Sequence, residues 1–216
     1  MHPKTIDWAH CAGLPKQIWL ASKSPRRLEL LQILGLNVQL ILPVCDQQAE
    51  QLETPLPQEN PLCYVQRVTQ LKLAKAQQQL QANHCAGLVL AADTTVALNE
   101  NILGKPTSIA QAQHMLRSLS GQTHQVHTAV AVADLTTHAL LMQVHTAQVQ
   151  FAEIPETFIQ SYVDSGEPFD KAGGYGIQGS IAQFIFNING SHSGIMGLPL
   201  YETSNLIRTL FKKTAQ

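Results

Sequence analysis

Hydrophobic and polar positions alternate along this chain in blocks that predict strands and helices in turn. Short apolar runs predict buried strands, and apolar residues that recur every three or four positions predict helices with one buried face. The predicted strands cover residues 17–21, 38–44, 88–92, 124–133 and 140–151, and the predicted helices cover 25–34, 107–119, 155–165, a long one from Pro61 and a last one from Pro199. This alternation predicts an α/β fold with a mixed sheet.

The first strand turns directly into a helix whose first turn carries two arginines, Arg26 and Arg27. Ser24 occupies the position of a helix N-cap. A helix N-terminus carries partial positive charge and favours anions, so two cations there call for an explanation. One explanation is a bound polyphosphate, held by the arginines, the free backbone amides and the hydroxyl groups of Ser22 and Ser24. The alternative is that both arginines are solvated.

A carboxylate follows the most continuous apolar run of the chain. Residues 88–92 are all apolar, as expected of a buried central strand, and Asp93 comes directly after them. The carboxyl edge of an α/β sheet is where such folds bind ligands, which favours a functional Asp93 over one that only caps a turn. Lys105, between a glycine and a proline, could reach a phosphate, whereas Lys72 on the long helix is typical of a solvated face.

Two later segments are rich in glycine. Four glycines among residues 173–179 allow the backbone to approach a ligand closely, and the alternative is a mobile surface loop. Further on, the apolar runs 181–188 and 195–196 flank Asn189 and Gly190, which is a strong sequence signal for a β-hairpin.

The composition limits the class of partner. The chain has 216 residues, 44% of them apolar and 13% charged, with a formal net charge of -1. This length fits one large domain or two small lobes around a cleft. A general nucleic-acid binder would show a basic face or a high pI, so nucleic acid is not expected as a partner. Small anionic ligands remain compatible, because a few local cations are enough to bind them.

Cysteine use and hydropathy predict a cytoplasmic location. The four cysteines are widely spaced and form no C-x-x-C pair, as expected of reduced thiols in the cytosol. No apolar run reaches the ~18 residues that a membrane span needs, so we expect no membrane partner. Residues 1–16 lack both periodicity and the pattern of a signal peptide, which predicts a loosely ordered tail before a domain at 17–216.

Six motifs, taken together and in order, resemble the Maf family of nucleoside triphosphate pyrophosphatases. They run from about Ile18 to the last helix and leave only the N-terminal tail uncovered. The motifs are Leu20-Ala21-Ser22-x-Ser24-Pro25-Arg26-Arg27-x-Glu29-Leu30-Leu31, Ala92-Asp93-Thr94, Gly104-Lys105-Pro106, Ser120-Gly121-x-x-His124-x-Val126-x-Thr128, Asp170-Lys171-Ala172-Gly173-x-Tyr175-Gly176-Ile177-Gln178-Gly179 and Gly197-Leu198-Pro199.

The resemblance implies a fold, an activity and a cofactor. The fold is an elongated, two-lobed single α/β domain with a central cleft and a mixed twisted sheet between helices, similar to the inosine triphosphatase type. The activity is hydrolysis of a nucleoside triphosphate to the monophosphate and pyrophosphate, assisted by a divalent metal, Mg²⁺ or Mn²⁺. The resemblance also suggests a homodimer.

The same resemblance assigns roles to residues. The catalytic set it implies is Ser22, Arg27, Lys72, Asp93 and Lys105. Arg26, Thr94 and Gln178 match the branch of the family that acts on dTTP and UTP. The implied metal ligands are Asp93 and Asp46. One departure concerns the metal: the family usually has a second acid directly after the Asp46 position, and this chain has Gln47.

Two other functions stay open on the sequence. One is a pyrophosphatase of the same fold that acts on purine or modified nucleotides. The other is a nucleotide-binding regulator of cell division that senses nucleotides without hydrolysing them. Release of pyrophosphate separates enzyme from regulator, and a panel of nucleotides separates the two enzymes.

Overall fold

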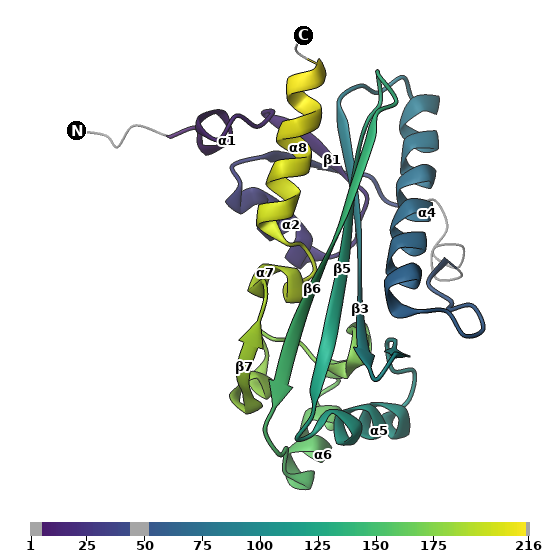
Figure 1. Ribbon diagram of the computed structural model, residues 1–216, viewed down its shortest axis with the longest axis vertical. Coiled ribbons are helices and arrows are strands. Elements are labelled where there is room, and N and C mark those ends of the chain that lie inside the picture. Colours follow the sequence, from purple (N-terminus) through teal and green to yellow (C-terminus); the bar gives the residue numbers. More distant parts are fainter. Residues whose placement is uncertain (1–5, 44–51, 215–216) are drawn as a thin grey trace.

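A mixed β-sheet is the central element of the computed structural model, which describes residues 6–43 and 52–214. Within that part of the chain, seven strands pair in the order β2-β1-β3-β5-β6-β7, and β4 pairs with β3 (Figure 1). The strands are β1 (Gln17–Leu20), β2 (Asn37–Leu40), β3 (Leu88–Leu98), β4 (Asn101–Leu103), β5 (Thr123–Asp134), β6 (Leu140–Phe151) and β7 (Ile185–Asn189). Strand β1 is parallel to β2 and β3, and the other pairs are antiparallel.

Helices pack on the sheet and at one end of it. They are α1 (Trp8–Cys11), α2 (Pro25–Ile33), α4 (Pro61–Ala82), α5 (Ile109–Leu119), α6 (Glu156–Asp164), α7 (His192–Met196) and α8 (Leu200–Thr214), with short 3-10 helices η1 (Glu167–Asp170), η2 (Ala172–Gly174) and η3 (Ser180–Phe184). Within the described residues, no helix has both the length and the hydropathy needed to cross a membrane.

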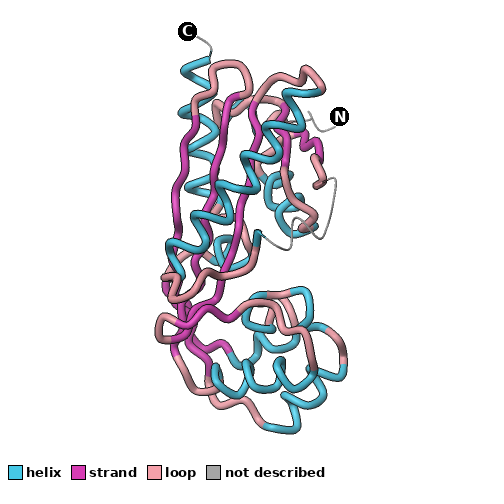
Figure 2. The backbone as a smooth tube through the Cα atoms, turned by 90° about the vertical axis from the view of Figure 1, so that its right-hand side faces the viewer, coloured by secondary structure: helices cyan, strands magenta, loops and turns pink. Residues whose placement is uncertain are grey.

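The long strands β3, β5 and β6 join two lobes into one elongated molecule (Figures 1 and 2). One core lies where α2 and α8 pack on the sheet, and it includes Leu31, Leu90 and Ile207. A second core lies at the other end, among α5, α6 and the strands, and includes Leu116 and Ile159. The predicted α/β fold with a mixed sheet and two lobes is confirmed.

Strand β3 presents its alternate residues to opposite helices. Leu90 packs in the core with α2 and α8, and Ala91 packs in a core with residues of α4. Side chains of successive strand residues point to opposite faces, so the same alternation continues beyond the apolar run. Asp93 therefore lies on the side of α4, and Thr94 lies on the side of α2.

An opening in the sheet lies beside these residues. Strand β1 pairs with β3 only as far as Leu20 and Leu90, and then the chain turns away into α2. Strand β4 joins the same edge of β3 only from Val96 onward. Among the described strands, residues 92–95 are therefore paired with β5 alone. Side chains from both faces of the sheet can meet around this open edge.

The local signals of the first strand–helix unit are confirmed. Ser24 is the N-cap of α2, and its hydroxyl oxygen accepts a hydrogen bond from the backbone N–H of Arg27. Pro25 is the first residue of the helix. Gly35 ends the turn with a left-handed φ of +77°, and a Cβ there would lie 2.8 Å from the backbone nitrogen of Ala9. The helix end thus packs directly on the N-terminal segment.

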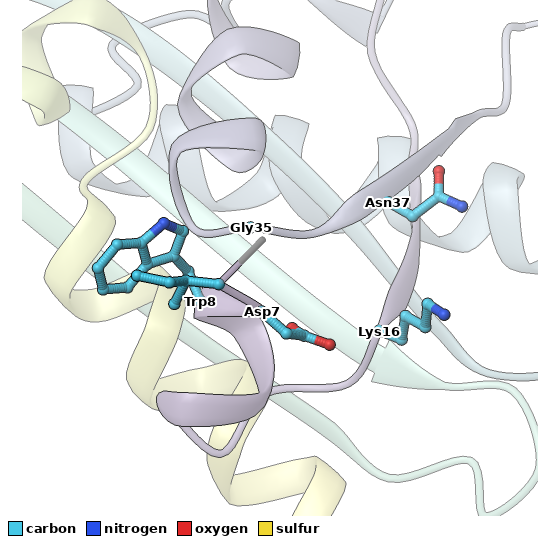
Figure 3. Close-up of a pocket in the computed structure, with 6 residues that line it drawn as sticks. Asp7, Trp8, Lys16, Gly35 and Asn37 are labelled. Atoms are coloured by element: carbon cyan, nitrogen blue, oxygen red, sulfur yellow. The ribbon is translucent and has the colours of Figure 1, made fainter. Parts of the chain in front are cut away.

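That contact shows that residues 6–14 do not match the loosely ordered tail expected of residues 1–16. Asp7 caps α1, and both Ala9 and Leu14 are buried in the core beside α2. The signal was missed because α1 is too short to show helical periodicity. A surface hollow of about 270 Å³ lies at this junction, lined by Ile6, Asp7, Trp8, Lys16, Gly35 and Asn37 (Figure 3).

The predicted hairpin at Asn189 and Gly190 is wrong. Strand β7 ends at Asn189, but the chain after Gly190 forms helix α7 because the Ser191 hydroxyl caps it by accepting from the N–H of Gly194. Strand β7 pairs instead with β6, which is distant in sequence. The apolar residues 195 and 196, read as a second strand, lie in that helix.

Candidate active site

A large cleft lies between the two lobes, beside the open edge of β3. Its volume is about 1400 Å³, and the 167–179 segment of one lobe faces the start of α2 and the middle of α4 in the other. Its lining includes every predicted site residue within the described chain, namely Ser22, Arg26, Arg27, Lys72, Asp93, Thr94, Lys105 and Gln178. Asp46, the remaining predicted residue, and Gln47 lie outside the described residues.

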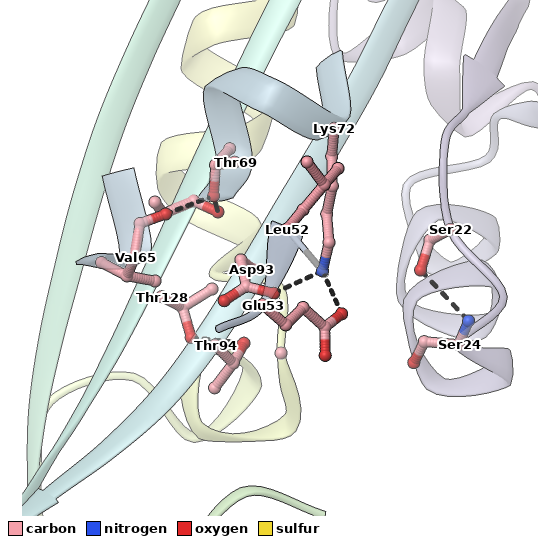
Figure 4. A network of polar contacts seen from close by, with 12 residues as sticks. Ser22, Ser24, Leu52, Glu53, Val65, Thr69, Lys72, Asp93, Thr94 and Thr128 are labelled. Carbon is pink, nitrogen blue, oxygen red and sulfur yellow. Dashed lines mark hydrogen bonds and ion pairs between the residues drawn. The ribbon is translucent and has the colours of Figure 1, made fainter. Parts of the chain in front are cut away.

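The inner wall of the cleft carries a chain of alternating charges (Figure 4). Lys72 Nζ lies 2.6 Å from Asp93 Oδ1 and 2.7 Å from Glu53 Oε1, and Lys105 Nζ lies 2.7 Å from Glu53 Oε2. Lys72 is thus a cleft residue with only 17% of its side chain exposed, which excludes the solvated face that its helix position suggested. Asp93 Oδ2 has no hydrogen bond or ion pair with any described residue.

Glu53 is the cleft residue that the sequence reasoning missed. It lies in a polar, proline-containing loop without periodicity, so no local pattern marks it. Burial favours its neutral form, but the charges of Lys72 and Lys105 and their hydrogen bonds outweigh burial and hold the pKa of Glu53 at about 2. Glu53 is therefore an anion at any physiological pH.

Helix α4 fixes the backbone around Glu53. The Tyr64 hydroxyl donates a hydrogen bond to the carbonyl oxygen of Glu53 at 2.8 Å. Arg67 donates to the neighbouring carbonyl oxygens of Leu52 and Thr54, and its guanidinium is also paired with Glu59. Side chains of one helix therefore bind three consecutive carbonyl groups, and these hydrogen bonds fix the position of Glu53 in the cleft wall.

Arg27 enters the cleft with neutral partners. Its Nε donates to the carbonyl oxygen of Gly197 at 2.9 Å, Nη1 to the hydroxyl of Ser22 at 3.3 Å and Nη2 to the hydroxyl of Thr94 at 3.3 Å. No carboxylate of the described residues forms an ion pair with it. Burial lowers the pKa of Arg27, although the charges of Asp93 and Glu53 act in the opposite direction. A partly buried cation held by neutral acceptors is well suited to bind an anion.

The outer part of the cleft brings together residues from both lobes. Arg26 Nη1, at the start of α2, lies 3.9 Å from Asp170 Oδ2 in η1. Gln178 is exposed, and it lines the cleft from the same lobe as Asp170. Thr94, in contrast, is hydrogen-bonded to Arg27 on the inner wall. The three residues predicted to select the nucleotide therefore lie in two parts of the cleft: Arg26 and Gln178 in the outer part, and Thr94 on the inner wall.

Some of the glycines in the 173–179 segment are explained by contacts within the protein. Gly173 has a left-handed φ of +69°, and a Cβ there would lie 3.0 Å from the side chain of Val96. A Cβ at Gly179 would overlap the carboxylate of Glu167. The packing of Gly173 on β3 and the burial of Gly174 and Tyr175 favour an ordered segment over the mobile loop that was the alternative.

Comparisons with known proteins show the family of this chain. A family model described as Maf-like protein matches residues 17–210. Three relatives that each bear the name dTTP/UTP pyrophosphatase come from Albidiferax ferrireducens (49% identical over 193 residues, 89% of this chain and 96% of the relative), Burkholderia lata (50% over 192, 88% and 91%) and Nitrosomonas europaea (48% over 193, 88% and 92%). Because both the family model and these relatives span most of its length, this chain belongs to the Maf family.

Proposed function

We propose that this protein hydrolyses dTTP and UTP to the nucleoside monophosphate and pyrophosphate. One observation carries the proposal: a partly buried guanidinium without a carboxylate partner among the described residues, that of Arg27, shares a cleft with Asp93, whose Oδ2 is not engaged by any described residue. The first suits a phosphate group, and the second suits a base for water. The names of the relatives support the choice of nucleotides.

The proposed reaction is an in-line attack of water on the α-phosphorus. A new bond forms from the water oxygen to the α-phosphorus, and the bond from that phosphorus to the oxygen bridging to the β-phosphorus breaks. Asp93 takes the proton from water, and the bridging oxygen leaves with pyrophosphate. Charge builds up on the phosphate oxygens, so Arg27, Lys72 and Lys105 stabilise the transition state. The hydroxyl of Ser22 adds a further phosphate contact.

A divalent cation, Mg²⁺ or Mn²⁺, belongs to this proposal. Mg²⁺ is usually held by one or two carboxylates together with phosphate oxygens and water. Within the described residues there is no group of three or more side chains placed to hold a metal. In the alternative to its role as base, Asp93 uses the same Oδ2 to bind an ion that arrives with the triphosphate, and Asp46 is the second proposed ligand. When bound, the ion would neutralise charge on the phosphates.

The test is a panel of nucleoside triphosphates with Mg²⁺ or Mn²⁺, in which pyrophosphate and monophosphate are measured separately. We expect pyrophosphate from dTTP and UTP, with a higher kcat/KM than for purine nucleotides. Phosphate released one unit at a time would contradict the proposed bond cleavage. Binding of nucleotides without any product would favour the regulator of cell division instead.

Gln178 is proposed to recognise the base edge of uracil and thymine. Its amide offers one donor and one acceptor, which match the adjacent N–H and carbonyl groups of these bases. We predict that Gln178→Glu lowers kcat/KM for UTP and dTTP by roughly 10- to 100-fold, because a carboxylate then faces a carbonyl oxygen. The measurement is the ratio of kcat/KM for UTP to that for GTP. An unchanged ratio would mean that Gln178 only supports its segment.

Glu53 is proposed to hold Lys72 and Lys105 until the triphosphate takes its place. Because the substrate and Glu53 compete for the same two ammonium groups, we predict that Glu53→Gln tightens binding of a non-hydrolysable UTP analogue by roughly fivefold, on the scale of a weak ion pair. The dissociation constant is measured by calorimetry in EDTA. The tightening should become smaller in a Lys105→Ala background, where Glu53 pairs with Lys72 alone. Weaker binding by Glu53→Gln would contradict the competition.

The cellular setting follows the same proposal. The substrate is a free nucleotide, and we propose that the protein acts in the cytoplasm as a homodimer. The described cysteines Cys11, Cys63 and Cys85 are free thiols, which supports a reducing compartment. Analytical ultracentrifugation of the purified protein measures the oligomeric state.

A further inference from the structure

We propose that Thr128 is a positioning residue that aims the guanidinium of Arg27, acting through the hydroxyl of Thr94. Thr128 is 1% exposed and is not part of the cleft lining. It therefore acts on the substrate only through its neighbours. The inference rests on the proposed function in one respect, namely that Arg27 binds the triphosphate.

The pairing of β3 with β5 brings the two threonines together. Thr94 and Thr128 are directly opposite each other in the antiparallel register. Side chains of such a pair point to the same face, and paired threonines form hydrogen bonds across strands. Their hydroxyl oxygens are 2.9 Å apart. The contact is thus set by the register of the two central strands.

The donors in this chain of hydrogen bonds can be assigned. Thr128 Oγ1 is 2.8 Å from the carbonyl oxygen of Gly194. A carbonyl oxygen can only accept, so the hydroxyl of Thr128 donates its one hydrogen to it. The bond between the threonines must then have Thr94 as donor. Arg27 Nη2 can only donate, so Thr94 Oγ1 accepts from it. The direction runs from Arg27 through Thr94 and Thr128 to the backbone of α7.

Helix α7 is the fixed end of this chain. The carbonyl oxygen of Gly194 accepts a hydrogen bond from the Thr128 hydroxyl. The carbonyl oxygen of Gly197, at the C-terminal end of the same helix, accepts one from Arg27 Nε. The helix is anchored on the sheet by His145, which is opposite Thr128 in β6 and whose Nε2 accepts from the backbone N–H of Ser191. The turn therefore holds Arg27 directly through Nε and indirectly, through Thr94 and Thr128, at Nη2.

This arrangement changes the role expected of Thr94. The only hydrogen of its hydroxyl is given to Thr128, so within this arrangement Thr94 has none to donate to a base or a phosphate. Its influence on the nucleotide must pass through the orientation of Arg27. Of the five N–H groups of that guanidinium, the bonds to Gly197, Ser22 and Thr94 use three and leave two for phosphate oxygens.

The test uses Thr128→Val, which keeps the shape of the side chain and removes its hydroxyl. We expect kcat/KM for UTP to fall about 10-fold and Thr128→Ser to restore it to within about twofold of wild type. In an Arg27→Ala background, Thr128→Val should cause no further loss. Thr69→Val is the matched control, because it removes another buried threonine hydroxyl, bonded to Val65 at 2.7 Å in α4. It should leave kcat/KM unchanged.

A purely structural role for Thr128 would give a different pattern. The losses from Thr128→Val and Arg27→Ala would then multiply, and Thr69→Val would lower activity as much as Thr128→Val. Either result would overturn the proposal. A second readout needs no catalysis: the side-chain ¹⁵N signals of Arg27 report hindered rotation of its guanidinium, which Thr128→Val should release. If no nucleotide is hydrolysed but rotation is released, the proposed function fails and the positioning role stands.

Discussion

Replacing Asp93 by asparagine should lower kcat for UTP and dTTP by roughly 10³-fold, within the range expected for loss of a general base or a metal ligand. The substitution keeps the size and shape of the side chain and removes its charge. Asp93 is buried in the wall of the cleft, where Oδ1 contacts Lys72 and Oδ2 is not engaged by any described residue. An amide can neither accept the proton of water nor bind a cation strongly.

The control for this result is Asp164→Asn, which makes the same chemical change at an exposed position in α6. Steady-state rates should be measured alongside thermal unfolding, because the charged neighbours of Asp93 also contribute to folding. A kcat above about a tenth of the wild-type value would remove Asp93 from the mechanism, since a tenfold loss is only ~1.4 kcal/mol of activation free energy.

Replacing Arg27 by alanine should lower kcat/KM for the triphosphates by about 10²- to 10³-fold, the usual effect of losing one group that stabilises developing charge. Binding of the monophosphate should change far less, because the proposed partner of Arg27 is the polyphosphate. Arg27→Lys should recover only part of the loss. A lysine keeps the charge but lacks the planar fork that reaches Gly197, Ser22 and Thr94 together.

Two measurements decide the role of Arg27. Calorimetry compares the affinities of UMP and of a non-hydrolysable UTP analogue for the wild type and the variant. Arg117→Ala serves as the control, because that arginine pairs with Glu156 on an exposed surface. Equal losses for the two ligands would contradict a phosphate-binding role and would mean that Arg27 mainly supports the start of α2.

The strand–helix elements of this protein were predictable because their signals are local. The N-cap at Ser24 and the apolar run 88–92 act over a few residues, and the structure contains the helix and the strand that they predict, except that β3 continues through Asp93 to Leu98. The prediction of a hairpin at Asn189 and Gly190 was wrong because its signal is equally local. A turn signal reports the bend but not which strand pairs with β7, and β6 competes for that pairing from far away in the sequence.

The sequence by itself determined the α/β fold class, the strand–helix unit that carries Arg27 and the buried strand on which Asp93 lies, although Asp93 is in the middle of β3 and not after its end. Only the tertiary structure decided that Glu53 joins Lys72 and Lys105, and that Thr128 is linked to Arg27. The physical reason is that side-chain hydrogen bonds and ion pairs act over a few ångströms in space. Strand register and helix packing bring their partners together, and neither leaves a periodic trace along the chain.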